Sequence, residues 1–127
     1  MVSQARANRI ANRIREELSE LMLFEITDPR LQGVSITQVF VDRELAFANI
    51  FVSSLEGSSR KDEILKGLNH ACGFIRRKLA HSIDLRTFPE LRFNWDPSPE
   101  HADRIDQLIT SLHDEQEQNK EENSANG

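Results

Sequence analysis

The chain contains 127 residues, of which 38% are hydrophobic and 29% are charged, a composition typical of one soluble globular domain. Its single cysteine excludes an internal disulfide bond and a zinc site made of several cysteines, and it suits a reducing compartment. No apolar stretch approaches the ~20 residues that cross a bilayer, and the N-terminus has no apolar signal region, so we expect a cytoplasmic protein without membrane contact.

The formal net charge of -5 conceals a separation of the two signs along the chain. Residues 1–95 carry 14 basic side chains against 12 acidic ones, whereas residues 96–127 carry 2 against 9. Salt at cellular concentration screens each charge over roughly 8 Å, so a basic patch persists on an acidic protein. The acidic balance therefore does not exclude nucleic acid as a partner.

Residues 4–24 are predicted to form the first helix, because apolar side chains recur at helical spacing and neither Gly nor Pro interrupts them. The stripe expected to be buried consists of Ala7, Ile10, Ala11, Ile14, Leu18 and Leu21. Arginines lead this helix and glutamates follow, which opposes the helix dipole. Two interpretations stay open for Arg6, Arg9 and Arg13: a solvated helix face, or a site for an anion.

Asp28-Pro29-Arg30 is predicted to be a structural turn in which the aspartate accepts hydrogen bonds from backbone N–H groups. Two strands should follow at residues 34–41 and 45–52, because both runs are rich in Val, Ile, Phe and Thr. Residues 42–44 would form the short hairpin connection between them. The residues predicted to be aromatic members of the core are Phe40, Phe47, Phe51, Phe74, Phe93 and Trp95.

The most informative segment runs from residue 61 to 95 and combines an amphipathic helix, a glycine break, a basic amphipathic helix and a short strand. We predict the break at Ala71-Cys72-Gly73, because glycine adopts backbone angles that a helix interior does not hold. Two short helices bent sharply against each other, with cations at the bend, would accommodate a nucleic-acid backbone. The cations in question are Arg60, Lys61, Lys66, Arg76, Arg77 and Lys78.

Residues 91–95 alternate apolar and polar side chains and are predicted to be the third strand. A last helix should use Ile105, Leu108, Ile109 and Leu112, so we place the folded domain at residues 1–112. Residues 113–127 are acidic and polar, which predicts a disordered tail. This tail could be a solubilising end, a competitor for the basic cleft, or a contact for another protein.

The predicted order is helix, strand, strand, helix, kink, helix, strand, followed by the C-terminal helix. It indicates an α+β fold with helices over one face of a small sheet. This is the arrangement of a type II KH domain. KH domains usually clamp RNA with a Gly-x-x-Gly loop between two helices. Here Ala71-Cys72-Gly73 stands in place of that loop.

From about residue 5 to 112 the chain resembles the bacterial ribosome-binding factor A family. The Ala-x-Gly kink is typical of that family. The other matching pieces are Asp28-Pro29-Arg30, Val34-Ser35-Ile36-Thr37, residues 48–53, residues 68–76, and Leu85-Arg86 with Pro89, Leu91, Phe93 and Asp96.

The resemblance implies a monomeric, non-enzymatic assembly factor without cofactors. Such proteins bind the free, immature 30S subunit and its 16S rRNA, assist late maturation and 5′-end processing of precursor rRNA, and act in cold adaptation. The alternative is a KH-like module that binds protein without contacting RNA. The predicted RNA-binding residues are Arg6, Arg9, Arg13, Arg60, Lys61, Lys66, Ala71, Cys72, Gly73, Arg76, Arg77 and Lys78.

Cys72 and His70 invite a catalytic or metal interpretation, which the pattern does not favour. Two potential ligands without a second pair do not form a zinc site, and nothing orients the histidine as a base. Cys72 is better explained as a small residue between closely packed helices. With its aromatic residues assigned to the core, the protein is expected to recognise RNA by shape and backbone rather than by bases.

Overall fold

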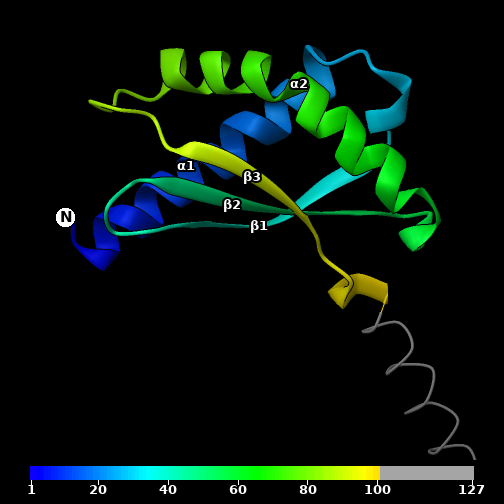
Figure 1. Ribbon diagram of the computed structural model, residues 1–127, viewed down its shortest axis with the longest axis horizontal. Helices are drawn as coiled ribbons and strands as arrows, with labels where there is room; N and C mark the ends of the chain where they lie inside the picture. The colour runs from blue at the N-terminus through cyan, green and yellow to red at the C-terminus, as the bar shows by residue number, and fades with distance from the viewer. Residues whose placement is uncertain (101–127) are drawn as a thin grey trace, which may run out of the picture. The chain divides into compact units, whose positions relative to one another are not determined.

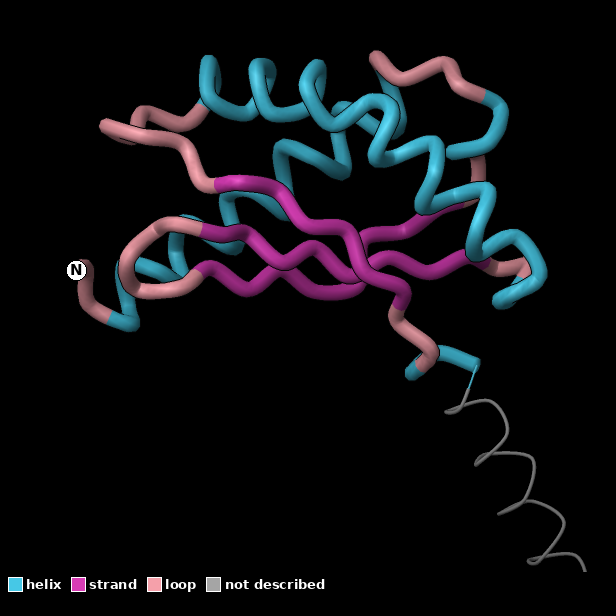
Figure 2. Tube along the Cα trace, in the orientation of Figure 1, coloured by secondary structure: helices cyan, strands magenta, loops and turns pink. Residues whose placement is uncertain are grey.

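In the computed structural model, the described residues are 1–100, and Met1–Asp96 form one compact unit. This unit contains α1 (Gln4–Phe24), β1 (Val34–Val41), β2 (Phe47–Ser54), α2 (Lys61–Ser82) and β3 (Glu90–Trp95), as Figures 1 and 2 show. Two short 3-10 helices, Pro29–Leu31 and Gly57–Arg60, precede β1 and α2. Residues 98–100 are helical. The predicted C-terminal helix beyond them and the tail at 113–127 lie outside the described residues.

The three strands form one sheet in the order β1-β2-β3. β1 and β2 are antiparallel, with Ile36 opposite Val52, whereas β2 and β3 are parallel, with Ala48 opposite Leu91. A parallel pair needs a long crossover connection, and α2 supplies it. The predicted α+β arrangement is therefore present in Met1–Asp96.

The core lies between one face of the sheet and the two long helices. β2 contributes Ala48, Ile50 and Val52, whose side chains are completely buried. The predicted stripe of α1 is confirmed residue by residue. The buried residues of α2 are Ile64, Gly67, Leu68, Ile75 and Leu79. All these side chains except Ala7 and Gly67 belong to one apolar cluster, so the helices are anchored to the same face of the sheet.

β2 begins two residues later than predicted. Leu45 has φ 57°, in the left-handed region, and its N–H donates to the carbonyl of Asp42. The carboxylate of Asp42 accepts a hydrogen bond from the N–H of Phe47 at 2.8 Å. The hairpin turn therefore extends through residue 46, because Leu45 cannot be part of an extended strand at a positive φ.

The prediction of two helices separated at Gly73 is wrong, because α2 is one continuous helix of 22 residues. Gly73 lies inside it, and the glycines with positive φ in the described residues are Gly33 and Gly57. Figure 1 shows that α2 changes direction partway along its length. The segment is thus a bent helix whose backbone stays helical through the glycine.

Gly67 and Gly73 should respond oppositely to alanine. A Cβ at Gly73 meets no atom within 4 Å, so Gly73→Ala should stabilise the fold by about 0.5–1 kcal/mol through helix propensity. A Cβ at Gly67 would lie 3.0 Å from Cδ2 of buried Leu31, so Gly67→Ala should destabilise the fold by about 1–2 kcal/mol. Urea midpoints at unchanged m-value would measure both. A destabilised Gly73→Ala would mean that the bend needs glycine.

The predicted aromatic core is present only in part. Phe93 and Trp95 are half-buried and pack against the core cluster. Phe40 is 55% exposed and Phe74 is 37% exposed, and half-buried Phe47 and Phe51 are not packed against that cluster. Phe88 is the buried aromatic residue of the described chain. Along β2 the phenylalanines alternate with the buried alanine, isoleucine and valine, so they occupy the sheet face that points away from the helices.

Candidate nucleic-acid interface

The arginines of α1 line a hollow beside the end of α2. Ser3 caps α1, accepting a hydrogen bond from the N–H of Arg6 at 3.1 Å. Three-residue and four-residue spacing then places Arg6, Arg9 and Arg13 on neighbouring turns. Together with Ile10 and residues 82–85 they line a hollow of ≈ 550 Å³.

Arg13 connects the two helices that form this hollow. Its Nη2 donates to the carbonyl of Ser82 at 3.3 Å, and its Nε pairs with Glu17 at 3.2 Å. A cation at the C-terminal end of α2 is favourable, because the last carbonyls of a helix carry partial negative charge. Within the described residues, the exposed guanidinium groups of Arg6 and Arg9 make no ion pair or hydrogen bond.

A second hollow, of ≈ 540 Å³, adjoins the first. Its walls include Gly73, Arg77, Arg86 and Leu85, and Leu85 also lines the first hollow. The two hollows are together lined by six arginines from three parts of the chain, and Leu85 lines both hollows. We call five of them, Arg6, Arg9, Arg13, Arg77 and Arg86, the basic surface; the sixth, Arg76, donates to backbone carbonyls.

The basic surface can hold a polyanion along its length. Asp84 is the one carboxylate among the described residues that line the two hollows. Planar guanidinium groups bind phosphate through two parallel N–H donors, which suits arginine for this task. The arrangement offers several phosphate sites without an enclosed pocket, as expected for a surface that contacts a nucleic-acid backbone.

Arg86 is the member of the basic surface that the sequence analysis did not select. It follows α2 in the connection to β3, at the end of the run Leu85-Arg86. The available signal was its position in a matching piece of the family pattern. Only the return of residues 83–89 beside α2 places it near Arg77 and Gly73.

Arg76 has a structural task. Its Nη2 donates to the carbonyl of Phe88 at 2.7 Å, and its Nε donates to the carbonyl of Pro89 at 3.2 Å. These bonds hold the second half of α2 against the start of β3. Replacing Arg76 would therefore disturb the fold and the basic surface together.

Lys78 lies on a different side of α2. Its Nζ pairs with Glu25 at 3.4 Å and lies 5.7 Å from the ring centroid of Phe74. It lines a third hollow together with Glu17 and Glu20 of α1. The acidic half of α1 therefore reduces the positive potential at Lys78.

The cations at the start of α2 are not brought to the basic surface. Lys61 and Lys66 are exposed on the first half of the helix. At 1.5 Å per residue, Lys61 lies about 24 Å along a straight helix from Arg77. The predicted set of RNA-binding cations is therefore divided between the two ends of α2.

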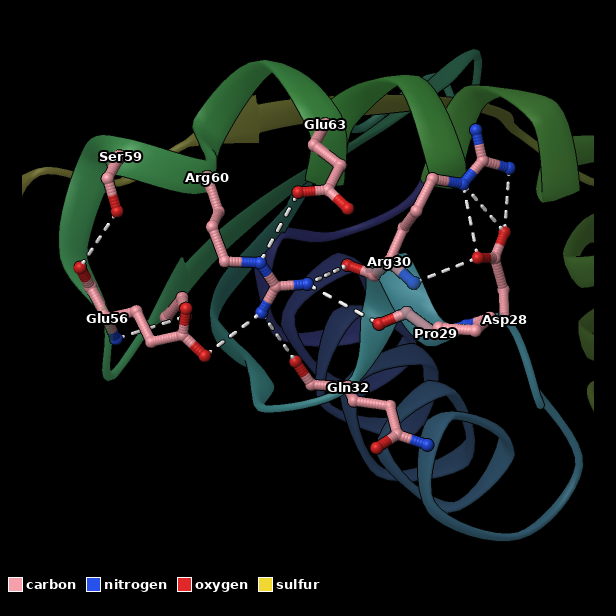
Figure 3. Close-up of polar contacts among 9 residues, drawn as sticks. Asp28, Pro29, Arg30, Gln32, Glu56, Ser59, Arg60 and Glu63 are labelled. Carbon is pink, nitrogen blue, oxygen red and sulfur yellow. Dashed lines mark hydrogen bonds and ion pairs between the residues drawn. The ribbon is translucent and has the colours of Figure 1, made fainter.

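Arg60 is engaged within the protein, as Figure 3 shows. Its guanidinium donates to the carbonyls of Pro29, Arg30 and Gln32 at 3.4, 2.8 and 3.1 Å. Glu56 and Glu63 also pair with it, at 3.3 and 3.5 Å, and its side chain is only 18% exposed. This network ties the start of α2 to the turn before β1.

The predicted turn at Asp28 is confirmed in the same region. The carboxylate of Asp28 accepts a hydrogen bond from the N–H of Arg30 at 2.9 Å, which caps the 3-10 helix. The side chain of Arg30 also pairs with that carboxylate at 2.7 Å (Figure 3). Hydrogen bonding by Arg30 lowers the pKa of Asp28, and Asp28 raises the pKa of Arg30. The Asp28 carboxyl consequently stays ionised at pH values below the usual titration range of aspartate.

Ala71 and Cys72 are half-buried and pack against the core. Cys72 does not separate two helices as predicted, because α2 is continuous through it. Burial raises the pKa of the Cys72 thiol, so the neutral thiol predominates near pH 7 and is a poor nucleophile. Within residues 1–100 no three histidine, cysteine or acidic side chains gather into a metal site. None of the helices found in that part of the chain is long and apolar enough to cross a membrane.

Comparison with solved structures supports the fold. The chain is similar to a Thermotoga maritima protein assigned as a ribosome-binding factor A, with TM-score 0.64, 30% identity, and coverage of 74% of this chain and 90% of the other. It is also similar to ribosome-binding factor A from Thermus thermophilus, with TM-score 0.63, 19% identity, and coverage of 70% and 93%. The predicted α+β, KH-like fold is confirmed.

Sequence comparison extends over most of the chain. It is 40% identical over 108 residues to ribosome-binding factor A from Aromatoleum aromaticum, which covers 85% of each chain. It is 33% identical over 121 residues to the protein of that name from Halothermothrix orenii, which covers 95% of this chain and 99% of the other. Residues 6–109 match the sequence profile described as Ribosome-binding factor A. The chain therefore belongs to the ribosome-binding factor A family.

Proposed function

We propose that this protein binds the free, immature 30S subunit in the cytoplasm as a monomer, with the basic surface on phosphates of 16S rRNA. The five arginines of the basic surface, in two hollows that share Leu85, carry this proposal. A further support is a Thermus thermophilus relative whose coordinates were fitted into a map of a 30S complex. That relative has 20% identity and a TM-score of 0.57.

The proposed action is a shift in the population of rRNA conformers. A protein that binds one conformer more tightly favours it by the difference in affinity, without a catalytic step. Phosphate contacts would position the protein, and the fit of α1 and the bent α2 to a folded junction would supply selectivity. Late maturation, 5′-end processing of precursor 16S rRNA and growth in the cold would depend on that shift.

The test is co-sedimentation of the full chain with free 30S subunits, free 50S subunits and assembled ribosomes across a salt series. We expect enrichment on free 30S subunits. Each phosphate contact contributes about 0.7–0.9 to the slope of log K against log salt concentration, so binding should fall steeply as salt rises.

Two results would count against the proposal. Equal binding to all three particles would remove the preference for the immature small subunit. Binding to 30S subunits that does not change with salt would favour a KH-like module that contacts protein rather than RNA. Neither result would affect the family assignment.

A further inference from the structure

Three phenylalanines lie on the sheet face that points away from the helices. Phe40 comes from β1, and Phe47 and Phe51 come from β2. The rings of Phe40 and Phe51 contact each other edge to face, with centroids 5.8 Å apart and an angle of 83°. Phe40 nevertheless remains 55% exposed, so much of its ring is open to solvent.

An arginine extends this aromatic cluster. Cζ of Arg92, on β3, lies 3.7 Å from the ring centroid of Phe47, a cation–π contact. Arg92 is itself exposed. A guanidinium on an aromatic ring provides a second surface for stacking and a positive charge for a nearby phosphate.

The remaining side chains of this face include amides and the exposed carboxylate of Glu90, which is opposite Phe47. Asn49 is opposite both Phe40 and Arg92 in the sheet, and Gln38 is opposite Phe51. Amide groups donate and accept hydrogen bonds and can read the edge of a base. Aromatic residues and arginine are enriched in contacts between proteins as well, so the amides beside the rings are the feature of this face that favours RNA bases.

We propose that the face defined by Phe40, Phe47, Phe51 and Arg92, the aromatic face, binds unstacked bases of single-stranded RNA. Phe40 offers an exposed ring for stacking on β1, and Arg92 offers a guanidinium on the ring of Phe47 across the sheet. The inference rests on the proposed function only for the source of the RNA, because the immature subunit would supply the single strands. It replaces the expectation that bases play little part in recognition.

The test compares Phe40→Leu with Phe24→Leu in the full chain. Phe24 is 80% exposed at the end of α1 and is a matched control for loss of an exposed ring. The probes are a single-stranded RNA of about 12 nucleotides and an abasic ribose-phosphate strand of equal length, titrated by fluorescence anisotropy.

Stacking of one base on an aromatic ring changes affinity by about fivefold or more. We therefore expect Phe40→Leu to bind the RNA at least about fivefold more weakly and to bind the abasic strand as the unaltered protein does. Phe24→Leu should bind both probes normally. An unchanged urea midpoint for Phe40→Leu would show that its fold is intact.

Several results would overturn the inference. One is equal RNA affinity for Phe40→Leu and the unaltered protein. Another is self-association without RNA that Phe40→Leu abolishes, which would assign the aromatic face to a second copy of the chain. The basic surface is tested separately, because removal of its arginines should weaken binding to both probes.

Discussion

Replacing Arg9 and Arg77 together by glutamine should weaken binding to free 30S subunits by about 25- to 60-fold at 0.1 M salt. The reason is that each lost phosphate contact contributes about 0.7–0.9 to the slope of log K against log salt concentration. The slope itself should fall by about 1.4–1.8. Both side chains are exposed at the basic surface, so the fold should be unaffected. Sedimentation across a salt series gives both quantities.

The matched control is Lys61→Gln with Lys66→Gln. This variant also removes two positive charges, but from exposed positions on the first half of α2. It should retain most of the affinity if contact is local to the basic surface. An equal loss in both double variants would mean that the contact extends along all of α2, or that net charge alone matters. Arg76 is unsuitable for this comparison because it holds the start of β3.

Periodicity predicted the helices and strands well, because each of these elements has one covered side. The apolar stripe of α1 repeats at helical spacing, and the structure buries those same residues. The outcome for β2 differs. Its phenylalanines and its small aliphatic residues lie on opposite faces, and both sets are apolar. Alternation alone does not say which face the helices cover, so Phe47 and Phe51 were assigned wrongly to the core.

The candidate site was only partly predictable from local sequence. The arginines of α1 form a cluster that is visible in the sequence. Arg77 and Arg86 are far from them in the chain and line a neighbouring hollow that shares Leu85 with theirs. Arg60 illustrates the opposite case. Its three carbonyl partners lie 28 to 31 residues earlier in the chain. A count of nearby charges cannot reveal such partners, so the structural contacts of Arg60 were not predicted from the sequence, and its contact with RNA stays a prediction.

Arg60→Ala should lower the free energy of unfolding by about 2–3 kcal/mol, because it leaves the carbonyls of Pro29, Arg30 and Gln32 without their charged donor. Arg60→Lys should recover little of this loss, since one ammonium group cannot reproduce the planar fork of a guanidinium. Urea unfolding at unchanged m-value measures both. Lys61→Ala, at the next and exposed residue, should change the free energy of unfolding by no more than about 0.5 kcal/mol.

The same variants decide whether Arg60 also contacts RNA. If its task is purely structural, Arg60→Ala should bind 30S subunits normally at a temperature where it remains folded. A protein of unchanged stability that binds weakly would instead return Arg60 to the phosphate contacts. That result would require the guanidinium to exchange Glu56 or Glu63, its two more exposed partners, for the phosphate. The three backbone carbonyls would then orient the cation toward RNA, and the basic contacts would include both ends of α2.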